Sequence, residues 1–248
     1  MRRLRTVTTF AFCLALLMAP RMATTDLVAD LSNHLVSITT GFTGADILLF
    51  GATEGEGDVV VVVRGPNATK VVRRKGRVGG IWINTAEVTF TDVPSFYAVA
   101  SSRPIEQFVS DSVGARHEIG IEQVRLTASD VAPAEDLSEF REGFIRNMQR
   151  SDLYTRETAQ IAFLGNRLFR TDIYFPDNAP TGIYTVAVYL LRDGEVTSAE
   201  ITPLVVSKVG FSARIFDFAH RHAMAYGVLA ILFAVVAGWI ASAVFRKE

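Results

Sequence analysis

The sequence predicts a mainly β domain that carries a helical insertion and is followed by one C-terminal transmembrane helix. Short apolar segments alternate with turn residues in two regions, and the stretch between them has helical spacing instead. Met224 to Phe245 carry no charged side chain, which matches the roughly 20 helical residues needed to cross a bilayer. We therefore expect a signal peptide (1–25), a β-sandwich segment (26–104), a helical insertion (105–158), a C-terminal β segment with a hairpin (159–209), a juxtamembrane amphipathic helix (210–223) and a transmembrane helix (224–245).

The N-terminus has the pattern of a secretory signal peptide. Arg2, Arg3 and Arg5 precede a short apolar run that ends near Ala19. An uncleaved signal anchor is the alternative, and in both cases the middle of the chain is exported. Cys13 is the one cysteine in the sequence and lies in this run, so the mature domain is expected to have no thiol for a disulfide or a nucleophile.

The first β segment is predicted from seven short apolar stretches separated by turn residues. One of them contains five consecutive valines, Val59 to Val63, which is typical of a central strand buried on both faces. The expected strands are Leu35–Thr39, Asp46–Phe50, Val59–Arg64, Thr69–Arg74, Ile81–Asn84, Glu87–Phe90 and Phe96–Ser101.

The second β segment contains a strong hairpin signal. Asp193-Gly194 separates two β-rich runs, and a type I′ turn needs positive φ at both of its central residues. We expect Ile161–Phe163 and Leu168–Phe175 to be strands before it, and Pro203 to mark an edge or a bulge after it.

A tyrosine motif in the same segment indicates the type of sandwich. Pro180-Thr181-Gly182-Ile183-Tyr184-Thr185-Val186 resembles the tyrosine-bearing strand of immunoglobulin-like sandwiches. The predicted fold is therefore an immunoglobulin-like antiparallel β-sandwich. Pro94-Ser95-Phe96-Tyr97 repeats the motif weakly, which leaves open whether the two β segments form one sandwich or two.

The insertion is predicted from apolar residues at helical spacing. Leu137, Phe140, Phe144, Ile145 and Met148 fall on one side of a helical wheel, with arginines and glutamates elsewhere. A shorter helix is expected over about Glu106 to His117. We expect both helices to pack against the sheets.

Several sequence blocks resemble one protein family over nearly the whole chain. They are Phe42 to Ala52, Arg64-Gly65-Pro66, Arg73-Arg74-Lys75, Gly80 to Asn84, Pro94 to Tyr97, Phe218-Ala219, Tyr226-Gly227, Gly238-Trp239 and Val244 to Arg246. In these blocks the chain resembles the alphaproteobacterial putative transmembrane protein family. The resemblance implies a bacterial inner-membrane protein with a signal, an exported domain and one C-terminal span. It implies no reaction, cofactor or catalytic residue.

A basic cluster in the first β segment is the candidate binding site for an anion. No acidic residue occurs between Asp58 and Glu87, and we expect two short strands joined near Lys75-Gly76 to place several cations on one face. Such clusters bind phosphate, sulfate or anionic headgroups. The alternative is a solvated hairpin whose charges protect a sheet edge. The candidate residues are Arg64, Lys70, Arg73, Arg74, Lys75 and Arg77.

Other candidate sites are weak. The acidic turn from Glu54 to Asp58 lacks the distal glutamate of a calcium loop, and the four histidines have no metal-ligand spacing. No nucleophile, nucleotide or metalloprotease motif is present, so we expect no catalytic residue, metal or cofactor. A net charge of −1, with 25 basic and 26 acidic residues, argues against nucleic acid as a partner.

Two features lie at the membrane. Phe211, Ile215 and Phe218, followed by His222, form one helical stripe that is typical of a helix lying among headgroups, although the same stripe could extend the anchor outward. Small residues recur every fourth position within the span, which lets two helices approach closely, although an alanine-rich segment produces such spacing by chance. These ridge residues are Ala230, Ala234, Gly238 and Ser242.

The sequence is consistent with three functions. The first is a non-enzymatic accessory or scaffold protein of a membrane or envelope complex, whose partners are the bilayer and another membrane protein or a second copy, met through the transmembrane helix. The second is a membrane-tethered binding module for an anionic solute or lipid headgroup. The third is an enzyme with an unrecognised site. For all three we expect the bulk of the chain in the periplasm and the C-terminus in the cytoplasm.

Overall fold

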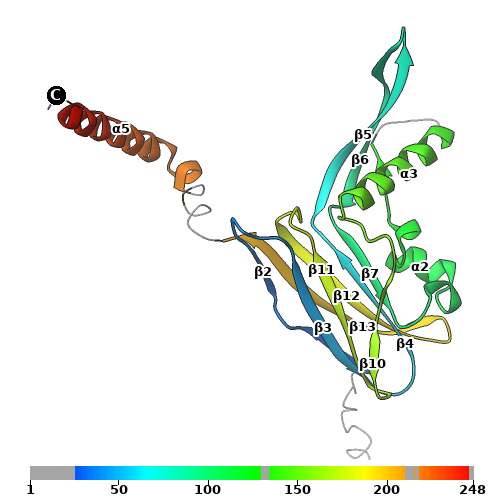
Figure 1. The fold of residues 1–248 in the computed structure, drawn as a ribbon. Helices are drawn as coiled ribbons and strands as arrows, with labels where there is room; N and C mark the ends of the chain where they lie inside the picture. Colours follow the sequence, from blue (N-terminus) through cyan, green and yellow to red (C-terminus); the bar gives the residue numbers. More distant parts are fainter. Residues whose placement is uncertain (1–25, 130–133, 210–214, 216–217, 246–248) are drawn as a thin grey trace, which may run out of the picture.

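The computed structural model describes residues 26–129, 134–209, 215 and 218–245, and within them the chain is mainly β (Figure 1). The predicted signal peptide, Cys13 and Phe211 lie outside the described residues. The strands of the described residues form three sheets. Their orders are β1-β3-β11-β10, β2-β13-β12-β4-β7-β9 and β5-β6-β8, which we call sheets A, B and C.

Sheets A and B pack face to face and form a β-sandwich. Sheet A is antiparallel and consists of β1 (Leu27–Leu31), β3 (Ala45–Thr53), β11 (Leu168–Phe175) and β10 (Ala162–Leu164). Sheet B consists of β2 (Leu35–Ile38), β13 (Glu195–Lys208), β12 (Gly182–Arg192), β4 (Asp58–Arg64), β7 (Tyr97–Ser101) and β9 (Ala159–Gln160). Side chains of both sheets meet in one apolar core, including Leu49, Phe169 and Tyr184. This arrangement is compatible with an immunoglobulin-like sandwich.

The two β segments of the sequence build the same sandwich rather than one each. Strand β3 of the first segment pairs with β11 of the second, and β4 pairs with β12. The question that the tyrosine motifs left open is therefore settled in favour of one sandwich.

The valine run lies at the centre of sheet B and is buried on both faces, as predicted. Val59, Val61 and Val63 point into the sandwich core, whereas Val60 and Val62 point into a second core. Sheet B is thus covered on both sides along β4, which explains a strand without polar alternation.

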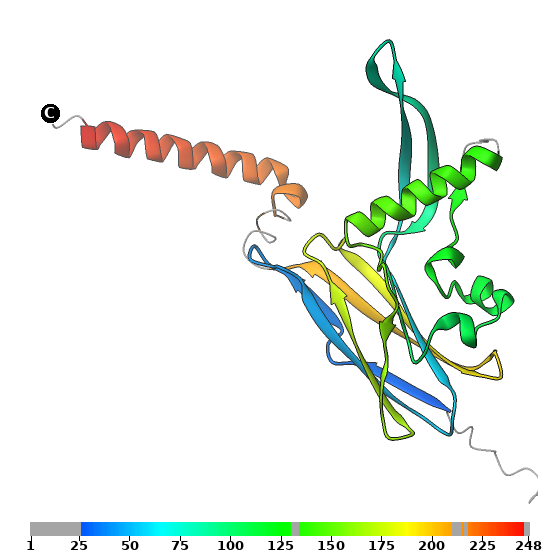
Figure 2. The same cartoon turned by 45° about the vertical axis from the view of Figure 1, so that its right-hand side comes forward.

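Helices of the insertion cover the second face of sheet B, as Figures 1 and 2 show. They are η1 (Ile105–Gln107), α2 (Asp111–His117), η2 (Ile121–Gln123) and α3 (Ala134–Arg150). The apolar stripe of α3 is buried as its spacing predicted, with Phe140, Phe144, Ile145 and Met148 in the second core. The single helix expected from Glu106 to His117 is wrong, because Ser110 caps a new helix by accepting a hydrogen bond from the Val113 amide.

Sheet C contains the long β5–β6 hairpin. Strand β5 (Asn67–Val78) pairs with β6 (Ile81–Pro94), and the short β8 (Thr127–Ala128) pairs with the base of β6. The turn expected at Lys75-Gly76 is wrong: the chain reverses at Gly79-Gly80, where both residues have positive φ. The two strands expected at Ile81–Asn84 and Glu87–Phe90 are one strand, which continues across a bulge at Thr85.

The second hairpin agrees with its sequence signal. Asp193 and Gly194 have φ of 51° and 81°, as the type I′ turn requires. Pro203 lies in the part of β13 that precedes its pairing with β2, which begins at Val205, so the proline lies at a locally open edge.

The C-terminal helix is separate from the sandwich. Helix α5 (Ala223–Phe245) contains a candidate span from Ala223 to Ala243 with a mean hydropathy of 2.2, and none of that span is buried within the protein. The side chains of this span are exposed on every side of the helix, as expected for a lone membrane helix.

Candidate functional site

The six predicted anion-binding residues are distributed over two separate places. Arg64 ends β4 and lines a hollow of about 390 Å³ with Asn67, Asp92, Glu118 and Arg125. Its guanidinium lies 3.2 Å from the Glu118 carboxylate, and Arg125 lies 3.7 Å from the other oxygen of that carboxylate. The other five candidates lie on β5 and do not line this hollow.

Two of the hairpin arginines are already paired with acids. Arg73 lies 2.9 Å from Glu87 on the neighbouring strand, and Arg74 lies 2.9 Å from Glu139 of α3. Arg74 also lies over the Phe140 ring, 5.6 Å from its centroid. Its position between the hairpin and α3 indicates that Arg74 helps to hold the two together.

The distal half of the hairpin carries exposed apolar side chains that the anion hypothesis did not include. Val78, Ile81, Trp82 and Ile83 are 56%, 69%, 65% and 45% exposed. We call these four residues, together with Lys75 and Arg77, the hairpin tip. Figures 1 and 2 show that this end of the hairpin projects beyond α3 and the sandwich.

The strand register sorts the hairpin tip into two faces. Arg77 is paired with Trp82, and Lys75 lies two positions before Arg77 on the same face. Val78 is paired with Ile81, and Ile83 lies two positions after Ile81. These three side chains share the face opposite to that of Arg77. One face of the tip is therefore basic and aromatic, and the other is aliphatic.

A second exposed apolar surface lies on sheet B. Ile183 is paired with Val205, and Val205 is also paired with Leu35, so these three side chains share one face. Ile201 precedes Val205 by four residues in β13 and therefore lies on the same face. This is the face that carries the helical layer, because Ile201 is paired with Ala187, which that layer buries. We call Leu35, Ile183, Ile201 and Val205 the β13 surface. The helical layer leaves it uncovered, and Ile201 is 61% exposed.

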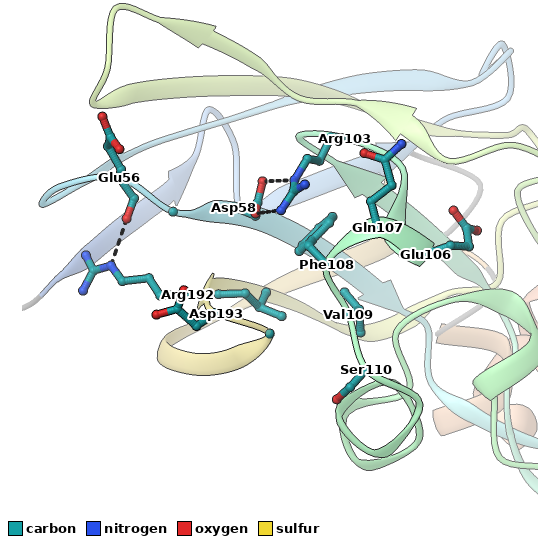
Figure 3. Close-up of a pocket in the computed structure, with 13 residues that line it drawn as sticks. Glu56, Asp58, Arg103, Glu106, Gln107, Phe108, Val109, Ser110, Arg192 and Asp193 are labelled. Carbon is teal, nitrogen blue, oxygen red and sulfur yellow. Dashed lines mark hydrogen bonds and ion pairs between the residues drawn. The ribbon is translucent and has the colours of Figure 1, made fainter.

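A hollow of about 690 Å³ is lined by several residues that bind one another (Figure 3). Arg103 donates two hydrogen bonds to the Asp58 carboxylate, at 2.8 and 2.7 Å, and lies over the Phe108 ring. Arg192 pairs with Asp26 at 2.8 Å and donates to the backbone carbonyls of Glu54 and Glu56. These contacts tie loops together and occupy the charges of Asp58, Arg103 and Arg192.

Three buried tyrosines have clearly shifted pKa values. Burial raises the pKa of Tyr97, Tyr154 and Tyr184 well above the usual range of a phenol. Each hydroxyl donates to a backbone carbonyl, of Glu118, Pro94 and Pro180 respectively. The neutral hydroxyls therefore serve as donors in structural hydrogen bonds within the core.

The histidines do not gather into a metal site in the described part of the chain, where no group of three His, Cys, Asp or Glu could hold an ion. His117 packs against the Tyr189 ring at 4.9 Å. Its pKa is lowered by burial, and further by the nearby charges of Arg116 and Arg64.

The ridge on α5 is exposed along its length. Ala230, Ala234, Gly238 and Ser242 are all exposed, and a Cβ added to Gly238 would meet no atom within 4 Å. Of the predicted stripe, Ile215 and Phe218 are described and exposed, and the Phe218 ring lies 5.6 Å from that of His222.

Comparison with known protein families supports the interpretation of α5 as a membrane-spanning helix. Residues 26–247 match the family described as putative transmembrane protein (Alph_Pro_TM). No curated protein and no solved structure gave a match. The match includes the mainly β region and α5, and the chain therefore belongs to the Alph_Pro_TM family of transmembrane proteins.

Proposed function

We propose that this protein is a non-enzymatic accessory or scaffold subunit of a membrane complex in the bacterial inner membrane. The sandwich lies in the periplasm, α5 crosses the bilayer and the C-terminus is cytoplasmic. The signal-peptide pattern at the N-terminus supports this orientation, because it directs export of the domain that follows it.

The observation that carries the proposal is the β13 surface. Among the described residues, the helical layer covers sheet B along β4, β7 and most of β12, but no residue covers the branched apolar side chains at the start of β12 and on β13 and β2. Exposed apolar patches of this kind mark interaction sites. Val205 lies three positions before the end of β13 at Lys208, from which the chain continues toward α5, so a membrane protein bound to α5 can also reach this surface.

The ridge on α5 gives the same partner a second contact. Close approach of small residues is one of the few ways in which helices recognise each other in lipid, where no hydrophobic force drives them together. A partner that binds both the ridge and the β13 surface contacts this protein inside the bilayer and also outside it.

Site-specific photocrosslinking in intact membranes tests the proposal. A photoreactive residue replaces Ile201 or Ala234 in the full chain, and the captured protein is identified. We expect the same membrane protein, or a second copy of the chain, from both positions. Val28 on the outer face of sheet A is the matched control, because it is also an exposed branched residue on a strand.

Two results would contradict the scaffold proposal. One is capture of different proteins from Ile201 and Ala234. The other is an equal yield of the same products from Val28, since the capture would then report abundance rather than binding. A specific partner should also be lost in the full chain carrying Ile201→Asp.

A further inference from the structure

We infer that the hairpin tip is a second membrane contact, which lies in the headgroup region of a bilayer that contains anionic lipid. The inference shares only the membrane anchorage by α5 with the proposed function and needs no protein partner. It gives a role to exposed side chains that neither core contains.

The register of sheet B places the hairpin and the membrane tether at the same end of the sandwich. Arg64 at the end of β4 is paired with Thr185, and Gly182 at the start of β12 is paired with Val206. The end of β4, the start of β12 and the end of β13 therefore lie together. Strand β5 begins at Asn67, three residues after Arg64, and the link to α5 follows Lys208.

The hairpin is long enough to carry its tip well away from the sandwich. Strand β5 has 12 residues, and at about 3.3 Å per residue it spans roughly 40 Å. The helical layer supports only the proximal part, where Val72, Val88 and Phe90 contact the second core and Arg74 binds Glu139. From Lys75 to Asn84 the side chains are exposed, apart from the position of Gly76.

The chemistry of the tip matches an interface with anionic lipid. Lys75 and Arg77 are its charged residues, and no acidic residue lies between them and Glu87. Trp82 provides an amphipathic ring of the kind that concentrates at headgroup depth, and Ile81 and Ile83 provide aliphatic groups for the acyl boundary. A single sign of charge beside one tryptophan and branched aliphatic residues favours lipid over a protein surface of mixed charge.

The backbone of the hairpin sets the depth of this contact. The strands β5 and β6 satisfy each other's hydrogen bonds, but the turn residues Gly79 and Gly80 leave polar groups that hydrocarbon would not solvate. The tip is therefore expected to rest in the headgroup layer, where water still reaches the turn, rather than to cross the bilayer.

Tryptophan fluorescence of the reconstituted full chain tests the inference. The chain has two tryptophans, Trp82 and Trp239, so Trp239→Phe leaves Trp82 as the only reporter. The protein is placed in vesicles of phosphatidylglycerol and phosphatidylcholine. We expect Trp82 emission to be quenched by lipids brominated near the headgroup and shielded from acrylamide in the water. Emission that acrylamide quenches freely and brominated lipid leaves unchanged would overturn the inference.

Substitution of two isoleucines that are similarly exposed distinguishes contact of the tip with lipid from a general effect of added negative charge. Ile81 and Ile201 are 69% and 61% exposed, so Asp at either position should leave the fold intact. Ile81→Asp should abolish lipid quenching of Trp82, and Ile201→Asp should preserve it. Equal quenching in both variants would contradict a role for the tip.

The basic face is tested by lipid charge. In anionic vesicles, Lys75→Ser and Arg77→Ser should each lower the ratio of docked to free tip about fivefold, and the loss should shrink in pure phosphatidylcholine. Unchanged quenching with both cations removed would overturn the anionic part of the inference. The vesicles contain no partner protein, so this failure would not affect the scaffold proposal, and a failed crosslink would not affect this one.

Discussion

The Tyr184 hydroxyl donates a 2.6 Å hydrogen bond to the carbonyl of Pro180, four residues upstream. This bond fixes the entry of β12 into the sandwich, because Tyr184 is buried beside Phe96 and Phe175. It is the contact that the tyrosine motif of immunoglobulin-like sandwiches makes. Tyr97, in the weaker copy of the motif, bonds instead to Glu118 across the second core.

We expect Tyr184→Phe to lower the free energy of unfolding by about 1 kcal/mol, since the ring stays and only the hydrogen bond is lost. Thermal melts of the full chain in detergent, followed by circular dichroism, would measure this. Tyr174→Phe on the exposed side of β11 is the control and should leave the melting temperature unchanged. Equal melting temperatures for both variants would show that the Pro180 contact contributes nothing.

The buried tyrosines also predict loss of stability at alkaline pH. Burial raises the pKa of Tyr97, Tyr154 and Tyr184 in the folded state above the value near 10 of an exposed phenol. The folded state therefore holds its protons more tightly, and this stabilisation is complete below pH of about 10 and is lost as the pH rises further. Melting temperatures measured across this range should fall steeply.

The variant Tyr184→Phe provides the control for that pH dependence. It removes one of the three phenols, so the fall in melting temperature above pH of about 10 should become shallower than in the parent chain. An identical slope would mean that Tyr184 does not contribute to the alkaline transition.

Local sequence chemistry predicted the centre of the sandwich and its tightest turn. Five consecutive valines fit only a strand with apolar surroundings on both sides, and Asp193-Gly194 tolerates the positive φ of a two-residue turn. Strand β1 was missed because Leu27, Ala29 and Leu31 alternate over only five residues, directly after a segment dominated by export signals.

The hairpin tip could not be predicted from local pattern. Ile81, Trp82 and Ile83 have the composition of a buried strand, and they are exposed because this end of the hairpin projects beyond α3 (Figure 1). The turn was misplaced because charged residues from Arg73 to Arg77 hide the strand alternation, so Gly76 resembled the end of β5. Which cations pair with acids depends on tertiary contacts such as that between Arg74 and Glu139.

The contact between Arg74 and Glu139 predicts different effects on stability for substitutions at Arg74 and at its neighbour Lys75. Arg74→Ser should destabilise the protein by about 1 kcal/mol, because it removes the cation from the Phe140 ring and from an ion pair that solvent partly screens. Lys75→Ser is the matched control and should leave stability unchanged, since its side chain is exposed. Chemical denaturation of both variants would test this, and equal destabilisation would contradict the assigned role of Arg74.

Gly51 is required by close packing in the middle of sheet A. It is paired with Ala29 on one side and Phe169 on the other, and an added Cβ would collide with the Phe169 ring and lie 2.5 Å from the Val28 carbonyl oxygen. Gly51→Ala should therefore cost about 1–3 kcal/mol of stability. Gly41→Ala, where a Cβ meets nothing within 4 Å, is the control and should be tolerated.

The ridge on α5 should be sensitive to bulk on one face only. Ala234→Leu with Gly238→Leu fills the groove through which a second helix would approach, so co-purification of the crosslinked partner should be lost while membrane insertion persists. Ala225→Leu with Ala243→Leu is the matched control, because each position lies nine residues from Ala234 and thus on the opposite face. Alkaline carbonate extraction should leave all variants in the membrane. If the partner stays bound to the ridge variant, or is lost equally from the control, the helix does not recognise it through these small residues.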